Sequence, residues 1–253
     1  MAGVTRLAGL IHGAGSVVAL TGAGVSVPSG IPDFRSPGTG LWENVDPMEV
    51  AHIDAFRADP VRFWSFYGAR FASLREKQPN GAHRALAALE RAGLLDAVIT
   101  QNVDMLHRRA GSSELVEVHG SIAGCSCLSC PGSVPLDEAR ERIAAAADGV
   151  PRCAGCGEPL KPDVVLFGEL LDPIALDRAR ELCERADVLL CIGSSLEVHP
   201  VAGLPLLTAA AGGSVAILTE GPTPLEEIAA VRLHGDVVEE LRALLAELGL
   251  DGA

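Results

Sequence analysis

Four cysteines in two C-x-x-C pairs form the most specific chemical pattern in the sequence. Cys127 and Cys130 make the first pair, and Cys153 and Cys156 make the second. Each pair can sit on a tight turn, and two such turns bring four thiolates into the tetrahedron that zinc prefers. Four thiolates leave no open position for water, so we expect one structural Zn²⁺ ion that stabilises the fold. Two disulfides or an iron–sulfur cluster are the alternatives, and nearby Cys125 could compete as a ligand.

A glycine-rich stretch, TGAGVSVPSGIPDFR, occupies residues 21–35. The apolar run at 16–20 before it is typical of a buried strand. Gly22, Ala23 and Gly24 carry almost no side chain, so a diphosphate could approach free backbone N–H groups at a helix start. The usual G-x-G-x-x-G fingerprint is absent, so a glycine-rich turn in another kind of α/β protein is the alternative. Asp33, Phe34 and Arg35 suit a loop that folds over a bound nucleotide.

Polar residues follow three further predicted strands. Gln101, Asn102 and Asp104 come after the strand at 95–100, and His119 comes after the strand at 115–118. Gly193, Ser194 and Ser195 come after the strand at 188–192. Strands that alternate with helices predict an α/β fold with a Rossmann-like, doubly wound parallel sheet. In such a sheet these residues lie together at the carboxyl ends of the strands, where ligands bind.

The remaining pattern predicts the other elements and the domains. We expect helices at 3–13, 60–76, 83–91, 137–147, 173–186, 200–211 and 237–248, and strands at 164–167 and 214–218, with short helical pieces in the irregular stretch 38–59. Pro60 suits the first helical position and Asn80 suits a helix cap. We expect a Rossmann-like domain at 1–37, 84–122 and 161–253. A cofactor loop and helical module fill 38–83, and a small zinc domain fills 123–160.

Composition excludes several classes of function. The 253 residues are 48% apolar and carry a net charge of −13, with a pI near 4.9. A basic face for nucleic acid is therefore not expected. No apolar run is long enough for a membrane span, and cleavage of a signal peptide would remove the glycine-rich loop. Of the seven cysteines, four have the paired spacing of metal ligands, which suits a reducing compartment. We therefore expect a cytoplasmic protein. Cys183 and Cys191 are expected as apolar filler.

Several motifs in order resemble the sirtuin family, the NAD-dependent protein-lysine deacylases. They are GAGVS, SGIPDFR, TQNVD, LVEVHG, the paired C-x-x-C, KPDVVLFGE, GSSLEV and a final GDVV. The resemblance covers residues 16 to 240. It implies a Rossmann-like NAD domain and a small zinc domain, with an acyl-lysine peptide bound in the cleft between them. The expected partners are acylated proteins, with no nucleic acid and no membrane, and the chain is expected to be a monomer.

The resemblance also assigns roles to single residues. In the family's mechanism the acyl oxygen attacks the nicotinamide ribose, and a histidine then activates a ribose hydroxyl as general base; the products are nicotinamide, free lysine and O-acyl-ADP-ribose. His119 matches that base, and Asn102 matches a second catalytic residue. An imidazole suits this work near neutral pH. The residues matched to NAD binding are Gly22, Ala23, Gly24, Asp33, Phe34, Arg35, Gln101, Asn102, Asp104, Gly193, Ser194, Ser195, Thr219 and Val237. Thr219 stands where the family usually has asparagine.

The substrate side is matched by Val164, Phe167 and Gly168, which flank the peptide in the family. Tyr67 and Arg70 in FWSFYGAR lie three positions apart and so on one helix face. In the family, Tyr-x-x-Arg in this stretch marks the enzymes that prefer succinyl- and malonyl-lysine, so the resemblance implies a bacterial member of that class. An arginine and a hydroxyl would offset the desolvation of such a carboxylate. The alternative is a plain deacetylase in which both residues are structural.

Two other classes of protein would account for part of the pattern. A hydride-transferring dehydrogenase would also use NAD, but it should show G-x-G-x-x-G and an acidic residue about 20 positions later. A zinc-ribbon module for nucleic acid should have a basic insert, yet residues 121–160 carry more acids than bases. Neither alternative accounts for the full set of motifs.

Overall fold

The computed structural model describes residues 2–33 and 46–250. Its larger lobe contains a six-stranded sheet in the order β3-β2-β1-β7-β8-β9, and all neighbouring strands are parallel. The chain builds β1, β2 and β3 in one direction and then continues on the other side of β1 with β7, so the strand order reverses between β1 and β7. The predicted doubly wound sheet is confirmed. Its strands are β1 (Val17–Thr21), β2 (Ala97–Thr100), β3 (Leu115–Glu117), β7 (Val188–Ile192), β8 (Ser214–Leu218) and β9 (Ala229–Leu233).

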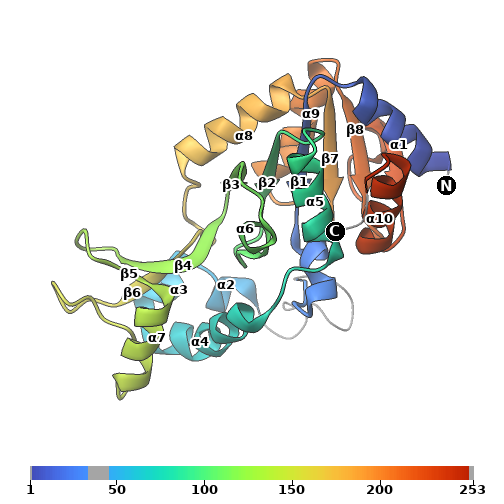
Figure 1. Cartoon of the computed structure of the whole chain (residues 1–253). Helices are drawn as coiled ribbons and strands as arrows, with labels where there is room; N and C mark the ends of the chain where they lie inside the picture. Colours follow the sequence, from blue (N-terminus) through green and yellow to red (C-terminus); the bar gives the residue numbers. More distant parts are fainter. Residues whose placement is uncertain (1, 34–45, 251–253) are drawn as a thin grey trace.

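Helices cover both faces of this sheet (Figure 1). One face packs against α1 (Ala2–Gly13), α5 (Gly81–Arg91) and α10 (Val237–Glu247), in a core that takes Val17 and Ala19 from β1. The other face packs against α8 (Pro173–Arg185) and α9 (Leu204–Ala210), in a core that takes Val18 and Leu20. Because both faces are buried, the strands read in the sequence as continuous apolar runs.

The smaller lobe has a separate core under a three-stranded antiparallel sheet in the order β5-β4-β6. Its strands are β4 (Gly120–Cys127), β5 (Ser133–Pro135) and β6 (Leu160–Val164). The lobe also contains the helices α2 (Pro47–Val50), α3 (Ile53–Ala58), α4 (Pro60–Glu76) and α7 (Leu136–Ala145). Phe63 and Trp64 of α4 pack with Ile122 and Leu160 of the sheet, and Trp64 Nε1 donates to the Leu160 carbonyl at 3.0 Å. The helical module and the cysteine-bearing segment therefore share one core.

Local signals placed the ends of two helices correctly. Pro60 stands in the first turn of α4, where Asp59 accepts a hydrogen bond from the Arg62 amide. Asn80 caps α5, and His83 returns a contact to the Asn80 backbone. The remaining short elements are η1 (Ala23–Ser29), α6 (Leu106–Ala110), η2 (Val201–Gly203) and η3 (Glu226–Ile228).

The strand predicted at 164–167 was wrong in place and in partner. The observed strand is β6, which ends at Val164 and pairs antiparallel with β4 in the small sheet. Residues 161–164, which were assigned to the Rossmann-like domain, thus extend the smaller lobe. The strands β4, β5 and β9 were not predicted. In β9 the burial is only partial, so the short edge strand lacks the continuous apolar run that marked the inner strands.

Candidate functional site

The glycine-rich loop after β1 packs directly on the turn after β7. Gly22 N–H donates to the Ile192 carbonyl at 3.0 Å, and Gly24 N–H donates to the Gly193 carbonyl at 2.8 Å. A Cβ on Gly24 would lie 2.8 Å from Gly193 Cα, and a Cβ on Gly193, whose φ is +60°, would lie 2.4 Å from the Val25 nitrogen. These glycines are therefore required because two backbones meet here.

This packing changes the expected role of the loop. The expectation was that free backbone N–H groups of this loop face an anion, and the amides of Gly22 and Gly24 already have carbonyl acceptors. Within residues 2–33 and 46–250, the Ala23 amide has no acceptor, and Ala23 is half-buried. One donor of the loop therefore remains for a diphosphate, which fits a nucleotide at this strand end.

A buried hydrogen-bond network links the loops after β1 and β2. Asn102 Nδ2 donates to the Gly22 carbonyl at 3.0 Å and to Ser26 Oγ at 3.1 Å. Ser26 Oγ donates to Asp104 Oδ2 at 2.6 Å. Both amide hydrogens of Asn102 are thus used inside the protein, which leaves its Oδ1 as the group that can accept from a ligand. Burial raises the pKa of Asp104.

Two buried histidines extend this network, although no role was predicted for them from the sequence. His83 Nδ1 accepts from the Asn80 amide at 3.4 Å, and its Nε2 lies 3.4 Å from Ser26 Oγ. His107 Nε2 lies 2.9 Å from Thr21 Oγ1, which donates to Thr100 Oγ1. Burial lowers the pKa of His83 to about 3 and that of His107 to about 4. Both rings are therefore neutral at physiological pH.

His119 is placed and polarised as a base would be. Its Nδ1 lies 3.1 Å from the Gln101 carbonyl. A carbonyl can only accept, so Nδ1 carries the hydrogen and Nε2 keeps its lone pair. Burial lowers the pKa of His119, and the hydrogen bond to Gln101 opposes that shift. The imidazole is therefore neutral near pH 7 and can take a proton at Nε2.

The other residues matched to the cofactor lie around the same edge. Gln101 Nε2 donates to Ser194 Oγ at 2.9 Å and so joins the loops after β2 and β7. Ser195 is exposed beside it, and Asp33 is half-buried at the end of the described segment. Thr219 follows β8, and its amide donates to the Leu233 carbonyl at 3.2 Å.

Val237 begins α10 with its side chain in the core, so a contact from Val237 would come from its backbone. Phe34 and Arg35 lie outside the described residues.

The residues matched to the acyl-lysine substrate lie on two parts of the smaller lobe. Val164 is buried at the end of β6, Phe167 is exposed, and Gly168 has a φ of +83°. Tyr67 stacks on Phe71 of the same helix, with ring centroids 5.2 Å apart, and burial raises the Tyr67 pKa to about 12.

Arg70 contacts its own helix. Its guanidinium carbon lies 3.6 Å from the centre of the Phe66 ring, and its Nη1 donates to the Phe66 carbonyl at 2.7 Å. Tyr67 and Arg70 thus share one helix face. Among the described residues, no hydrogen bond or ring contact joins the two side chains.

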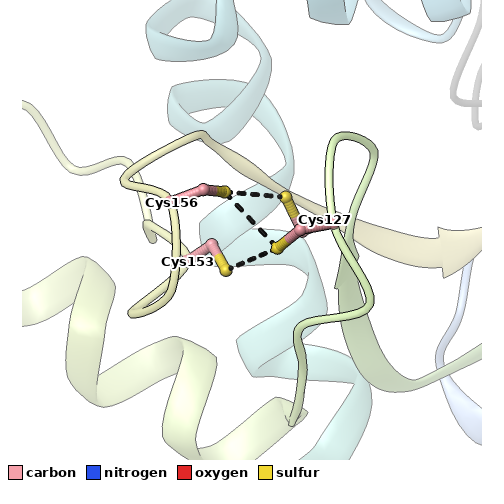
Figure 2. Close-up of side chains that lie close together, drawn as sticks. Cys127, Cys153 and Cys156 are labelled. Atoms are coloured by element: carbon pink, nitrogen blue, oxygen red, sulfur yellow. Dashed lines mark hydrogen bonds between the residues drawn. The ribbon is translucent and has the colours of Figure 1, made fainter.

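The four paired cysteines come together in space. The Sγ atoms of Cys127, Cys130, Cys153 and Cys156 all lie within 4.8 Å of one another, and Figure 2 shows the labelled three pointing toward one centre. Their closest separations are 3.4 to 3.5 Å, far longer than the ~2.05 Å of a disulfide. A tetrahedron with Zn–S distances of about 2.3 Å has edges of about 3.8 Å. The cluster therefore fits a structural zinc ion.

The other cysteines do not belong to this cluster among the residues described. Cys125 is buried in β4, and burial raises its pKa to about 12. Cys183 and Cys191 lie in the core between the sheet, α8 and α9. The prediction that they are apolar filler is confirmed.

Across the described ranges, no helix is both long and apolar enough to span a bilayer.

Together, the reversed strand order, the loops at that reversal and the four-cysteine lobe define a dinucleotide-binding α/β enzyme with a structural metal. Comparison with known proteins narrows this class. The model of the Sir2 family matches residues 22–200. An Archaeoglobus fulgidus protein named NAD-dependent protein deacylase 1 is 45% identical over 228 residues, which cover 89% of this chain and 91% of the relative. A Thermotoga maritima NAD-dependent protein deacetylase is 40% identical over 92% of this chain and 93% of its own length.

Solved structures agree with the sequence relatives. A Sir2 structure described as holding a p53 peptide and NAD⁺ superposes with a TM-score of 0.89 and 39% identity, over 96% of this chain and 98% of the other. A Sir2 protein bound to a propionylated peptide gives a TM-score of 0.90 and 38% identity, over 98% and 99%. The chain belongs to the Sir2 family.

Proposed function

We propose that the chain uses NAD to remove acyl groups from protein lysines. Family membership supports this class of activity, as do relatives named NAD-dependent protein deacylase or deacetylase. The single observation that carries it is the state of His119, whose Nδ1–H is bound to the Gln101 carbonyl and whose Nε2 is left as a base. His119 stands at the same edge of the sheet as the loops after β1, β2 and β7.

The residues at this edge have separate tasks. NAD, when bound, supplies the reactive bond between ribose and nicotinamide. Asn102, with both amide hydrogens held by Gly22 and Ser26, presents Oδ1 to a ligand hydroxyl or a water molecule. His119 takes a proton at Nε2 from a ribose hydroxyl. Gln101 holds His119 through its carbonyl and Ser194 through its amide, so one residue orients both sides of the site.

The zinc lobe has a structural task in this proposal. Four thiolates fill a tetrahedral shell, so the ion would not activate water. We also propose that the large sheet with its helices forms the NAD domain, and that the small sheet, the helical module and the four cysteines form the second lobe. The acyl-lysine peptide lies along the segment Val164–Gly168 between them.

We propose further that the enzyme acts on succinyl- and malonyl-lysine in addition to acetyl-lysine. Tyr67 and Arg70 support this, because they share one face of α4 and would provide a hydroxyl and a guanidinium for an acyl carboxylate. Arg70 Nη1 donates to the Phe66 carbonyl, so the side chain must turn away from that carbonyl to reach a substrate. The same contact supports a second candidate, a plain deacetylase in which Arg70 only stabilises α4.

Matched peptides separate these two candidates. Acetyl-, succinyl- and malonyl-lysine versions of one peptide are incubated with NAD, and the products are weighed by mass spectrometry. We expect Arg70→Met to lower desuccinylation at least tenfold while deacetylation stays within twofold. Arg62→Met on the same helix, which removes an exposed ion pair with Glu49 at 2.6 Å, is the control. An equal loss of both activities in Arg70→Met would mean that Arg70 is structural.

A further inference from the structure

The segment that follows β6 is anchored by a buried lysine with no spare donor. Lys161 Nζ donates to the Pro162 carbonyl at 3.0 Å and to the Val164 carbonyl at 2.7 Å. The same nitrogen lies 3.0 Å from Glu169 Oε2, and the two side chains are only 10% and 21% exposed. An ammonium group has three N–H donors, so these three oxygens satisfy it completely.

Glu169 closes the turn that Lys161 anchors. Glu169 Oε2 accepts from the Leu166 amide at 2.9 Å, and the Glu169 amide donates to the Leu166 carbonyl at 3.0 Å. The turn from 166 to 169 is thus held by its own backbone and by one carboxylate. The ion pair then joins this turn to β6, so the backbone from Val164 to Gly168 has its shape set by two charged side chains.

The same segment touches the proposed base and the helical module. The Val165 amide donates to the His119 carbonyl at 2.9 Å. On the other side, Phe167 exchanges hydrogen bonds of 2.9 Å with the backbones of Ala51 and Ile53. A displacement of the turn would therefore move the peptide-flanking backbone relative to His119.

The choice of lysine at this position is itself informative. Of the 20 basic residues only Lys77 and Lys161 are lysine, and the other 18 are arginine. Position 161 is deeply buried, with three oxygens converging on one point. A compact ammonium fits that geometry, whereas a planar guanidinium spreads its donors over a wider fork. Arginine, which the chain prefers elsewhere, would not replace Lys161 here.

We propose that Lys161 and Glu169 are positioning residues for the acyl-lysine substrate. They hold the backbone of Val164–Gly168 in the form that the substrate strand binds, and they keep it registered against His119. The inference rests on the proposed deacylase function of the same site. Because neither residue is assigned to the cofactor side, their loss should weaken the use of peptide and leave the use of NAD almost unchanged.

The test compares Michaelis constants in Lys161→Met, which keeps most of the length of the side chain and removes the charge and its donors. We expect the KM for an acetyl-lysine peptide to rise at least tenfold, with the KM for NAD within twofold of the parent. A reversibly unfolded fraction weakens the apparent binding of both substrates, since both bind only the folded protein. Loss of stability alone would therefore not raise the peptide KM while the KM for NAD stays unchanged. Lys161→Arg should resemble Lys161→Met. Arg180→Met, which removes an exposed pair with Asp177 at 3.1 Å, should leave both constants unchanged.

Glu169→Gln provides a second, milder variant, since the amide keeps an acceptor for Leu166 but loses the charge. We expect a rise of threefold or more in peptide KM, and this variant decides the question if Lys161→Met does not fold. A peptide KM within twofold of the parent, together with a lower melting temperature, would overturn the proposal and leave the pair a purely structural role. If the parent enzyme itself does not deacylate the peptide, the proposed function fails instead, and the two failures are distinct.

Discussion

Replacing Gly24 with alanine would put a methyl group where the structure has no room. The new Cβ would lie 2.8 Å from Gly193 Cα, 2.8 Å from Gly193 O and 3.1 Å from its carbonyl carbon. Carbon atoms in favourable contact are about 3.5–4.0 Å apart, so the two loops must separate by roughly 0.7 Å or more. All the contacted atoms are backbone, so no change of rotamer relieves them.

The size of the effect follows from this geometry. Overpacking of a tightly packed site costs about 1–3 kcal/mol. In a chain of this size 1 kcal/mol lowers the melting temperature by about 2–4 °C. We therefore expect the ligand-free Gly24→Ala protein to melt roughly 2–12 °C below the parent. The matched control is Gly9→Ala on the exposed side of α1, where no heavy atom lies within 4 Å of the new Cβ. That change should stabilise the helix by about 0.5–1 kcal/mol.

Thermal unfolding without NAD, followed by calorimetric titration with NAD, separates two reasons for the glycine. Separation of the loops breaks the Gly24–Gly193 hydrogen bond and moves the Ala23 amide, so NAD affinity should fall about tenfold, which corresponds to about 1.4 kcal/mol. If Gly24→Ala melts like the parent and only NAD binding is lost, the glycine serves the approach of the anion and our packing argument is refuted. If neither property changes, the contact itself is wrong.

Three further predictions concern the base, the metal and the buried histidines. His119→Ala should abolish turnover, while calorimetry should find an NAD affinity within threefold of the parent's. Because burial lowers the His119 pKa, the acidic limb of the parent's pH–kcat profile should lie below the usual histidine pKa of about 6.5. Exhaustive chelation should release one zinc per chain, measured by atomic emission, and lower the melting temperature, whereas a chain that holds no zinc would contradict the assignment of the four cysteines. Burial holds the pKa of His107 at about 4 in the folded protein, whereas the exposed imidazole of the unfolded state has a pKa of about 6.5. As the pH falls below ~6.5 the unfolded state therefore binds a proton first, and the free energy of unfolding drops by about 2 kcal/mol by pH 5. Urea unfolding at pH 7.5 and 5 should show a smaller loss in His107→Gln, and an unchanged loss would exclude this histidine as the cause.

Local patterns were sufficient for the elements that carry the site. The strands β1, β2, β7 and β8 are buried on both faces, so each is written as an apolar run that ends in glycine or polar residues. Parallel pairing then brings the carboxyl ends of β1, β2 and β7 to one edge. The proximity of the loops after them follows from the fold class, without any knowledge of side-chain contacts. The two C-x-x-C pairs were equally readable, because zinc constrains their spacing.

Other features depend on partners that are distant in the sequence. Ser26 and Asp104 are 78 positions apart, and neither residue type alone predicts that the two side chains share a hydrogen bond. The reason for Gly24 lies in Gly193, on a different loop. The run KPDVVLF predicts a strand but does not indicate which of the two sheets the strand joins. That depends on its pairing with β4, and a short stretch of sequence contains no information on this pairing.

The position of His119 in the chain explains why a chemically inert metal lobe matters to the reaction. Val118 still bonds to the large sheet, through its amide and the Thr100 carbonyl at 3.1 Å. Gly120 already pairs with Val164 in the small sheet, and its φ is +74°. His119 thus lies directly between Val118, which still bonds to the large sheet, and Gly120, where the small sheet begins. Its ring is held by Gln101 of the large lobe, and its backbone is held by Val165 of the small lobe. Because β4 ends at the first zinc ligand, Cys127, loss of the metal would loosen the strand that begins beside the base. Zinc would therefore influence turnover through the backbone of His119, without contact with either substrate.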